Sequence, residues 1–340
     1  MGARAEVVRR FFAEVRSASH ERFAGLIDFS YQHYALGDAL TTQVNLACLA
    51  KEAGCSAIDL HLIVDPVFPA APTQGFINSE NYRVHVDNLL PAFLCLPGLG
   101  SLRLVRDSMA AGLTLLRLVA SRAPMWPSLR EHLRHAMSYP MGHEIINAFY
   151  RREGYLPRLG PPRGYGRWAR SFLAKHWGGR FAVCINPRQS RLAAVPATTY
   201  RDSPLEEWHA FIDAAGARYP DVHFFMLGGF PEWDSTLARR ANVSIPRVMG
   251  LTLAHELALI ASSDLFMGTS SGFATMATFC GAPYVITNIE QAFAPYAGIP
   301  ANAPRYPFAT ELQHLDWRRE DARMLMEHLE SMYRRLGEKA

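Results

Sequence analysis

Short apolar runs alternate with helical patterns through the second half of this 340-residue chain, and this order constrains the fold more than any other feature. Residues 180–187 are predicted to form a buried strand, and an amphipathic helix pattern follows them. Three further strands are predicted at 222–229, 264–268 and 283–288, with helices between them. Because strands that alternate with helices form right-handed crossovers, we predict a parallel sheet covered on both faces.

The first half carries the same signal more weakly. Strands are predicted at 23–32 and 57–65, with a turn and a helix between them at 33–54. Helical segments are predicted near 102–121 and 127–150.

A basic segment joins the two halves. Residues 152–168 are dense in Pro, Gly and Arg, so we place the domain boundary between about 155 and 178. The predicted architecture is two Rossmann-like α/β domains, residues 1–165 and 176–340, the second ending in an amphipathic helix. Ligands are expected where the strand ends face the cleft between the domains.

The first helix of the second domain has a recognisable start. Ser203 is predicted as its N-cap, Pro204 as its first residue and Glu206 as the partner that completes a capping box. Apolar side chains then recur at helical spacing on one face.

Composition describes a globular protein and excludes several classes. The chain is 49% hydrophobic and 19% charged, and its net charge of +4 is too small for a dedicated nucleic-acid binder. Five scattered cysteines without a CxxC pair argue against a disulfide framework and for a reducing, cytoplasmic compartment. Residues 1–23 are predicted to form an amphipathic helix, and the apolar tract at 88–122 is interrupted by prolines and charges.

Common catalytic and cofactor motifs are absent. The chain has no GxxxxGK followed by Ser or Thr, no GxGxxG after a strand and no GxSxG. His143 and Glu144 lack the second histidine of a zinc-protease helix, and no other spacing suggests a metal site. We therefore predict neither a metal nor a cofactor.

The stretch "GTSSG" at 268–272 is the best candidate for an anion site. Thr269, Ser270, Ser271 and Gly272 lie between a predicted strand and a predicted helix. Unpaired backbone N–H groups and the helix dipole make such a position favourable for phosphate, and small residues allow it to approach. The alternative is that Ser270 or Ser271 merely caps the helix.

Two other strand ends in this half carry candidate donor contacts. Arg188, with Arg191 close behind it, follows the strand at 180–187, and a guanidinium grips phosphate through two parallel hydrogen bonds. Gly228 and Gly229 end the next strand and leave room for close backbone approach. A surface arginine and a plain β-turn are the respective alternatives.

A carboxylate follows the first strand of the chain. Gly37 and Asp38 are expected in the turn before the first helix, where Asp38 either caps that helix or faces the cleft and accepts a proton. Glu80 and Asp87 are alternative bases.

These motifs together resemble GT-B glycosyltransferases, and heptosyltransferase-like enzymes in particular. The resemblance rests on "LGDALTT" after the first strand, the strand ends Asn-Pro and Gly-Gly, and "SSDLFMGTSSGFATMATFCGAPYVITN". The last motif, together with "YRDSPLEEW", is also similar to a group of bacterial polysaccharide glycosyltransferases. Thr269 and Ser270 stand where heptosyltransferases often carry an acidic residue, so the sugar stays open.

The resemblance implies a metal-independent, inverting glycosyltransferase that uses a nucleotide-diphospho-sugar. It implies a donor on the second domain beside residues 269–272, Arg188 on the leaving diphosphate, and Asp38 as the base. The acceptor would be a glycan, a glycolipid or a protein in bacterial surface glycoconjugate synthesis. A sugar-nucleotide epimerase and a non-catalytic nucleotide- or glycan-binding scaffold are alternatives. The basic segment at 151–180 suggests peripheral contact with the inner face of the membrane.

Overall fold

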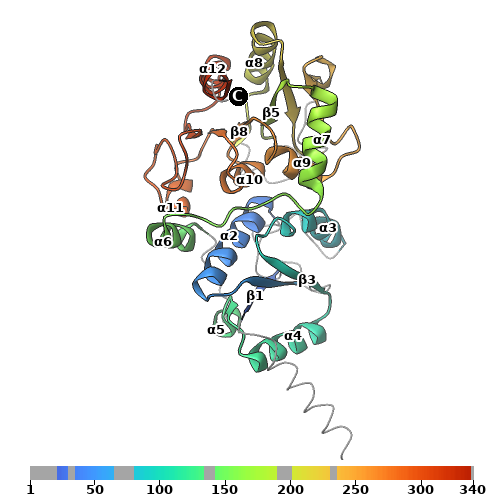
Figure 1. Cartoon of the computed structure of the whole chain (residues 1–340), viewed down its shortest axis with the longest axis vertical. Helices are drawn as coiled ribbons and strands as arrows, with labels where there is room; N and C mark the ends of the chain where they lie inside the picture. The colour runs from blue at the N-terminus through green and yellow to red at the C-terminus, as the bar shows by residue number, and fades with distance from the viewer. Residues whose placement is uncertain are drawn as a thin grey trace, which may run out of the picture.

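The computed structural model describes residues 21–29, 35–64, 80–133, 142–189, 201–229 and 236–337. Residues 1–20 of the helix predicted at 1–23 lie outside the described part of the chain, and so does Arg191. The described chain forms two parallel sheets, one in each half, with helices on their faces (Figure 1).

The sheet of the first half has four strands in the order β3-β2-β1-β4. All of its pairings are parallel, and its strands are β1 (Arg22–Asp28), β2 (Ala57–Ile63), β3 (Leu99–Val105) and β4 (Met125–Trp126). Its helices are α2 (Leu36–Glu52), α3 (Tyr82–Phe93), α4 (Ser108–Ser121), α5 (Leu129–Leu133) and α6 (Glu144–Glu153).

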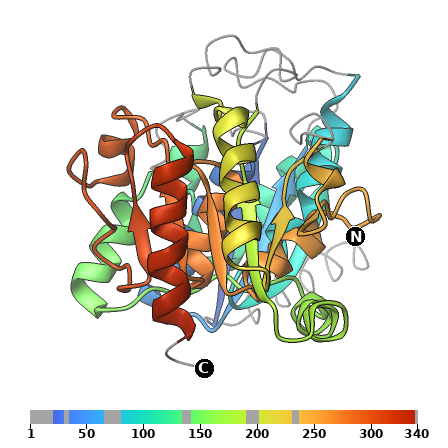
Figure 2. The same cartoon turned by 90° about the horizontal axis from the view of Figure 1, so that it is seen from above.

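The sheet of the second half has six strands in the order β10-β9-β8-β5-β6-β7. Its parallel strands are β5 (Phe181–Asn186), β6 (Val222–Met226), β7 (Val243–Ser244), β8 (Leu265–Thr269), β9 (Tyr284–Thr287) and β10 (Gln313–Leu315). The helical elements here are α7 (Tyr165–Trp177), α8 (Leu205–Arg218), η2 (Leu237–Arg239), α9 (Leu253–Ile260), α10 (Gly272–Cys280), α11 (Phe293–Ala297) and α12 (Ala322–Gly337). Helices α8 and α12 lie side by side on one face of this sheet (Figure 2).

The predicted parallel α/β architecture is confirmed in both halves, with the predicted strands in place. The helix predicted near 102–121 was wrong at its start: residues 102–105 belong to strand β3, and the helix begins at Ser108. Short apolar runs fit either period, so the pattern alone does not separate a strand from the helix that follows it. The predicted helix at 127–150 is two shorter helices, α5 and α6, with residues 134–141 outside the described part.

The two halves share a hydrophobic core. One cluster of buried side chains includes Leu40 and Val44 of α2 together with Phe273 and Ala277 of α10. Because these side chains pack together, helices α2 and α10 meet in a packed contact, which fixes the strand ends of one half relative to those of the other.

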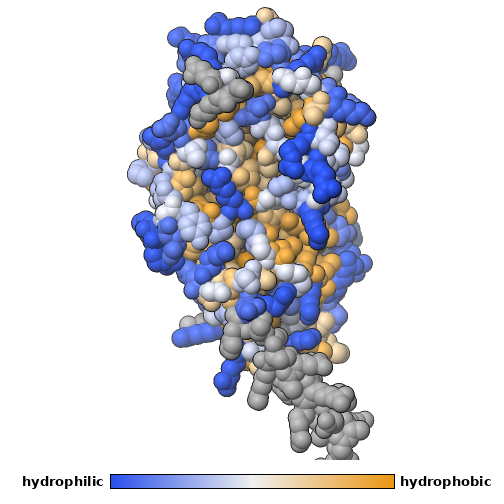
Figure 3. All heavy atoms as spheres, viewed as in Figure 1, coloured by the Kyte–Doolittle hydropathy of each residue, from blue (hydrophilic) through white to orange (hydrophobic). Residues whose placement is uncertain are grey.

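Hydrophobic residues also gather at the surface, across the middle of the molecule and beside α3, on the face shown in Figure 3.

The segment between α6 and α7 crosses from one half to the other. It is followed by α7, whose Trp168, Phe172 and Trp177 pack on the core of the second half. The basic segment at 151–180 thus consists of the last turn of α6, a short crossing and helix α7. Among the described residues all five cysteines are free thiols, and no helix is long and apolar enough to cross a membrane.

Candidate active site

The N-terminal ends of α2 and α10 touch each other. A Cβ atom on Gly272 would lie 2.6 Å from Cβ of Leu36 and 2.9 Å from the backbone nitrogen of Gly37. A Cβ atom on Gly37 would lie 3.2 Å from Oγ1 of Thr275. Glycine at 272 therefore permits the two helices to approach end to end. Each helix N-terminus carries about half a positive charge, so the two ends together concentrate positive charge at one place.

A cavity of about 300 Å³ lies at this junction. Both halves line it: Asp38 and Thr41 come from α2, and Arg188 and Ser270 come from strand ends of the second sheet. The remaining polar and aromatic lining is Gly37, His143, Arg201, Ser271, Gly272, Thr275, Thr278, Phe279, Phe293, Tyr296 and Tyr306.

Ser271 is the N-cap of α10. Its Oγ accepts a hydrogen bond from the backbone N–H of Ala274 at 3.3 Å and donates one to Oδ1 of Asn186 at 2.7 Å. The amide of Asn186 donates in turn to the carbonyl oxygen of Leu227 at 2.9 Å. The capping alternative is therefore confirmed for Ser271, and the ends of β5 and β6 hold the cap in place. Ser270 also lines the cavity.

Two arginines reach the same cavity. Arg188 follows β5, and its backbone N–H donates to Oγ of Ser203 at 3.0 Å. Arg201 was not singled out in the sequence because it follows no recognisable strand. Its Nε is buried without a hydrogen-bond partner among the described residues, and its carbonyl oxygen accepts from Asn288 at 3.2 Å. Two guanidinium groups and two helix ends make this pole of the cavity strongly attractive to an anion.

The carboxylate of Glu320 is buried beside Ser203, the residue that binds the backbone of Arg188. Oε1 of Glu320 accepts hydrogen bonds from Thr269, from Thr287 at 3.0 Å and from Ser203 at 3.2 Å. Burial raises the pKa of Glu320, and these hydrogen bonds only partly oppose the shift. Because Ser203 also holds the backbone of Arg188, Glu320 positions Arg188 through one intervening hydroxyl.

This network changes the interpretation of two residues. Thr269 is fully buried, its hydroxyl is bound to Glu320, and it does not line the cavity. Ser203 is not the N-cap of α8: the cap is Pro204, without a side-chain hydrogen bond, so the predicted capping box was wrong. The hydroxyl of Ser203 is engaged by buried partners instead.

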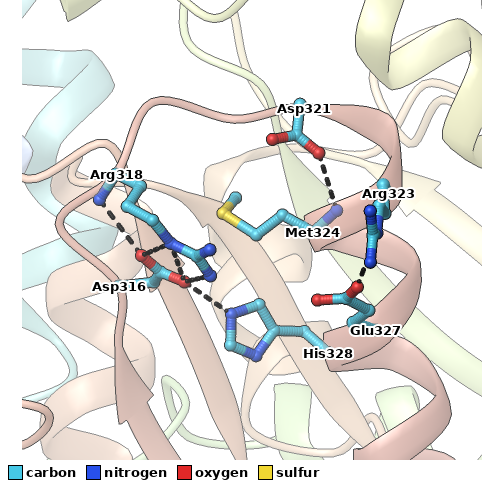
Figure 4. A network of polar contacts seen from close by, with 7 residues as sticks. All are labelled: Asp316, Arg318, Asp321, Arg323, Met324, Glu327 and His328. Carbon is cyan, nitrogen blue, oxygen red and sulfur yellow. Dashed lines mark hydrogen bonds and ion pairs between the residues drawn. The ribbon is translucent and has the colours of Figure 1, made fainter.

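The segment on either side of Glu320, which leads into α12, is fixed by its own polar contacts (Figure 4). Asp316 accepts hydrogen bonds from Arg318 and from His328 at 2.8 Å. Burial would raise the pKa of Asp316, but the hydrogen bonds from His328 and Arg318 outweigh it and hold the pKa well below its usual range. Asp321 accepts from the backbone N–H of Met324 at 2.8 Å, so both sides of Glu320 are fixed.

Asp38 lies in the first turn of α2 and not in the turn before it, because the helix begins at Leu36. The N-cap of α2 is Ala35, which makes no side-chain capping bond, so Asp38 is not the cap. The hydroxyl of Tyr296, from α11, donates to Oδ1 of Asp38 at 3.3 Å. The carboxylate thus faces the cavity and is oriented from the other half of the molecule.

Another part of the cavity lining is aromatic. The ring of His143 lies 5.3 Å from the ring of Phe279, 5.7 Å from Tyr296 and 5.4 Å from Tyr306, measured between centroids. Burial lowers the pKa of His143 to about 4, so the ring is neutral at physiological pH. Its Nδ1 is buried without a hydrogen-bond partner among the described residues. A neutral, unsatisfied imidazole lined by aromatic rings suits an uncharged, flat or sugar-like group.

The other predicted site residues lie apart from the cavity lining. Gly228 is buried, has φ of 141° and donates its N–H to Oε1 of Glu256 at 3.1 Å, and Gly229 follows it. Neither glycine lines the cavity. Of the alternative bases, Asp87 lines a separate cavity of about 40 Å³, and Glu80 lines neither.

Among the residues that the structure describes, no group of three or more His, Cys, Asp and Glu side chains is arranged to hold a metal ion.

Comparison with known proteins gives a match in structure alone. No protein-family model matches the chain, and no curated protein matches its sequence. A family 9 glycosyl transferase from Veillonella parvula superposes with a TM-score of 0.52 at 11% identity, over 93% of this chain and 97% of that one. The ADP-heptose lipopolysaccharide heptosyltransferase II of Escherichia coli superposes with a TM-score of 0.55 at 12% identity, over 94% of this chain and 100% of that one. With one parallel sheet in each half and a cavity that both halves line, the chain has the GT-B fold of these glycosyltransferases.

Proposed function

We propose that the protein is a glycosyltransferase that moves a sugar from a nucleotide-diphospho-sugar to an acceptor hydroxyl. One observation carries the proposal: two helix N-termini and two arginines, Arg188 and Arg201, converge on a single cavity between the sheets. A diphosphate carries two or more negative charges, and this arrangement supplies compensating positive charge from both halves of the chain.

The leaving group would be stabilised without a metal ion. As the bond between the anomeric carbon and the diphosphate oxygen breaks, its electron pair remains on the nucleoside diphosphate. Arg188 and Arg201 would neutralise that charge, together with the N–H groups of the first turn of α10. Preorganised donors aimed at developing charge are usually the largest single contribution to catalysis.

Asp38 is proposed as the general base. The acceptor oxygen forms the new bond to the anomeric carbon from the side opposite the diphosphate, which inverts the configuration, and its proton passes to the carboxylate of Asp38. The hydrogen bond from Tyr296 orients the carboxylate toward the cavity. General-base assistance of this kind is worth roughly 10²–10⁴-fold in rate.

One structural neighbour, the heptosyltransferase II of Escherichia coli, is named for ADP-heptose. This supports a nucleotide-diphospho-sugar as the donor class here, whereas the base and the sugar are left open. The proposed acceptor is a glycan, a glycolipid or a protein, the proposed role is in bacterial surface glycoconjugate synthesis, and the proposed location is the cytoplasm.

The experiment is a donor panel of UDP-, GDP-, ADP- and CMP-sugars incubated with the protein, with and without a mixed glycan and glycolipid acceptor panel. A glycosyltransferase releases nucleotide in an acceptor-dependent manner and forms a product heavier by one sugar. An epimerase instead isomerises the sugar without any acceptor, and a scaffold binds nucleotide without turnover. Either of those outcomes contradicts the proposal.

A further inference from the structure

Helix α4 is apolar on two faces, and only one of them is covered. Its inner face packs on a small buried cluster through Ala110, Ala111 and Leu115. Its outer face exposes a stripe of large apolar side chains: Met109 at 77%, Leu113 at 61%, Leu116 at 59% and Val119 at 43%. These positions recur every three or four residues and so lie along one side of the helix.

This concentration is unusual within the molecule. Among the described residues nine large hydrophobic side chains are exposed, and four of them lie on α4. Single exposed hydrophobic side chains are common, whereas a contiguous stripe indicates an interaction surface. α4 lies against the sheet of the first half, at the end of the molecule remote from α8 and α12 (Figure 1).

The surroundings of the stripe are basic. Arg117 lies on α4, while Arg106 and Arg122 flank its two ends, and all three are exposed. Arg103 is also exposed, and it pairs in register with His61 of the neighbouring strand β2, so both side chains lie on the same face of the sheet. Burial, together with the charges of Arg103 and Arg117, lowers the pKa of His61 to about 4.

An acidic residue beside the stripe, Asp107, is engaged by the helix itself. Asp107 precedes α4, and its Oδ1 accepts from the backbone N–H of Ala110 at 2.7 Å. If two copies of this face met across a two-fold axis, arginines would oppose arginines. The charge of the face therefore complements an anionic partner and disfavours a second copy of the chain.

We propose that α4 docks the protein on an anionic lipid membrane. The stripe from Met109 to Val119 enters the interface, and Arg106, Arg117 and Arg122 contact the lipid headgroups. The helix has 14 residues and lies in the plane of the surface without crossing it. This inference does not depend on the proposed function.

The structure favours α4 over the basic segment that the sequence suggests for membrane contact. Helix α7 exposes Arg167, Arg170 and Lys175, but its large apolar side chains pack inward on the core. α7 therefore offers charge without an exposed apolar stripe, whereas α4 offers both.

The test is sedimentation of the full-length protein with vesicles of phosphatidylcholine alone and of phosphatidylcholine mixed with anionic phosphatidylglycerol. The variants are Leu113→Asp/Leu116→Asp on α4, Val248→Asp/Met249→Asp as a control of similar exposure, and Arg167→Glu/Arg170→Glu on α7. Thermal unfolding of each variant verifies that it is folded, and light scattering reports the oligomeric state.

Wild-type protein is expected to bind anionic vesicles at least tenfold better than neutral ones, and added salt should weaken that binding. The α4 variant should lose at least tenfold, while the control and the α7 variant should lose less than twofold. Binding that survives in the α4 variant overturns the proposal, as does binding that only the α7 variant abolishes. A wild-type dimer that becomes monomeric in the α4 variant, with no vesicle binding by either, also overturns it, because the occupant is then a second copy.

Discussion

The hydroxyl of Tyr296 and the carboxylate of Asp38 meet at 3.3 Å, and they come from opposite halves of the molecule. Asp38 lies in the first turn of α2, while Tyr296 lies in α11, the helix that follows strand β9. A residue of the second half therefore orients the proposed base of the first. The burial of Tyr296 raises the pKa of its phenol, and the nearby charge of Asp38 raises it further, so the phenol remains a hydrogen-bond donor.

Replacement of the base should separate turnover from binding. Asp38→Asn keeps the size of the side chain but removes its basicity, so kcat should fall roughly 10²–10⁴-fold with little change in nucleotide affinity. Tyr296→Phe should cost about fivefold in kcat, because the carboxylate stays but loses a neutral hydrogen bond of about 1 kcal/mol. Asp213→Asn, on an exposed face, is the control. Near-wild-type turnover of Asp38→Asn would leave this residue a purely structural role.

The contact between α2 and α10 should tolerate no side chain at Gly272. Gly272→Ala places a Cβ 2.6 Å from Cβ of Leu36, so the helices must separate, at a cost of roughly 1–3 kcal/mol in unfolding free energy. Nucleotide affinity should fall with it, because both helix ends face the cavity. Gly112→Ala in α4 is the matched control: no atom lies within 4 Å of its new Cβ, and it should be stabilising by about 0.5–1 kcal/mol. Equal stability of the two variants, measured by urea unfolding, would refute the close approach.

Glu320 should matter for both stability and nucleotide binding although it lies outside the cavity. Glu320→Ala leaves three buried hydroxyls, on Ser203, Thr269 and Thr287, without their shared acceptor, and should cost roughly 2–4 kcal/mol of unfolding free energy. Because Ser203 holds the backbone of Arg188, nucleotide affinity measured well below the melting temperature should also fall.

The matched control for this variant is Glu327→Ala. Glu327 is 58% exposed and pairs with Arg323 on the surface of α12, so its loss should cost less than about 1 kcal/mol. A Glu320→Ala variant with wild-type nucleotide affinity would show that the network supports the fold without positioning Arg188.

Acid should destabilise the protein through its buried histidines. Burial lowers the pKa of His143 from 6.5 to about 4, so between these values the folded state binds fewer protons than the unfolded state. The unfolding free energy therefore rises with pH across this window. The contribution of His143 is fully present above about pH 6.5 and is lost as the pH falls toward 4. His143→Phe should remove about 3 kcal/mol of this pH dependence.

His61 and His223, whose pKa values burial also lowers to about 4, should keep the remainder of the slope. Chemical unfolding at half-unit steps between pH 4 and pH 7.5 measures both proteins. Identical slopes for wild type and His143→Phe would contradict the assignment of this contribution to His143.

Much of the fold could be predicted from the sequence because its strands are buried on both faces. The strands at 181–186, 222–226, 265–269 and 284–287 read as continuous apolar runs, as expected for a covered parallel sheet. Strand β3 was missed because it is only partly buried and carries an exposed Arg103, so its pattern merges with that of the following helix.

The site could be predicted only where a motif lies at a strand end or at the start of the helix that follows a strand. Arg188, Ser270, Ser271 and Gly272 line the cavity from strand ends, and Asp38 lines it from the first turn of α2. Arg201, His143 and Tyr296 reach it from loops and helices far apart in the sequence, and no local pattern shows that such residues meet. Glu320 lies 51 residues beyond Thr269, and its pairing is a property of tertiary packing alone.

The central claim is that the cavity binds a nucleoside diphosphate through Arg188 and Arg201, and titration calorimetry tests it most directly. UDP, GDP, ADP and CMP are titrated into wild type, Arg188→Ala, Arg201→Ala and the exposed control Arg323→Ala, which is 89% exposed in the wild type. At least one nucleoside diphosphate should bind the wild type and the control equally, and each cavity variant should bind it roughly 10- to 100-fold more weakly, as expected for the loss of one charged hydrogen-bonding group. If no nucleotide binds above background, or if Arg188→Ala and Arg201→Ala bind as tightly as wild type, the account is wrong.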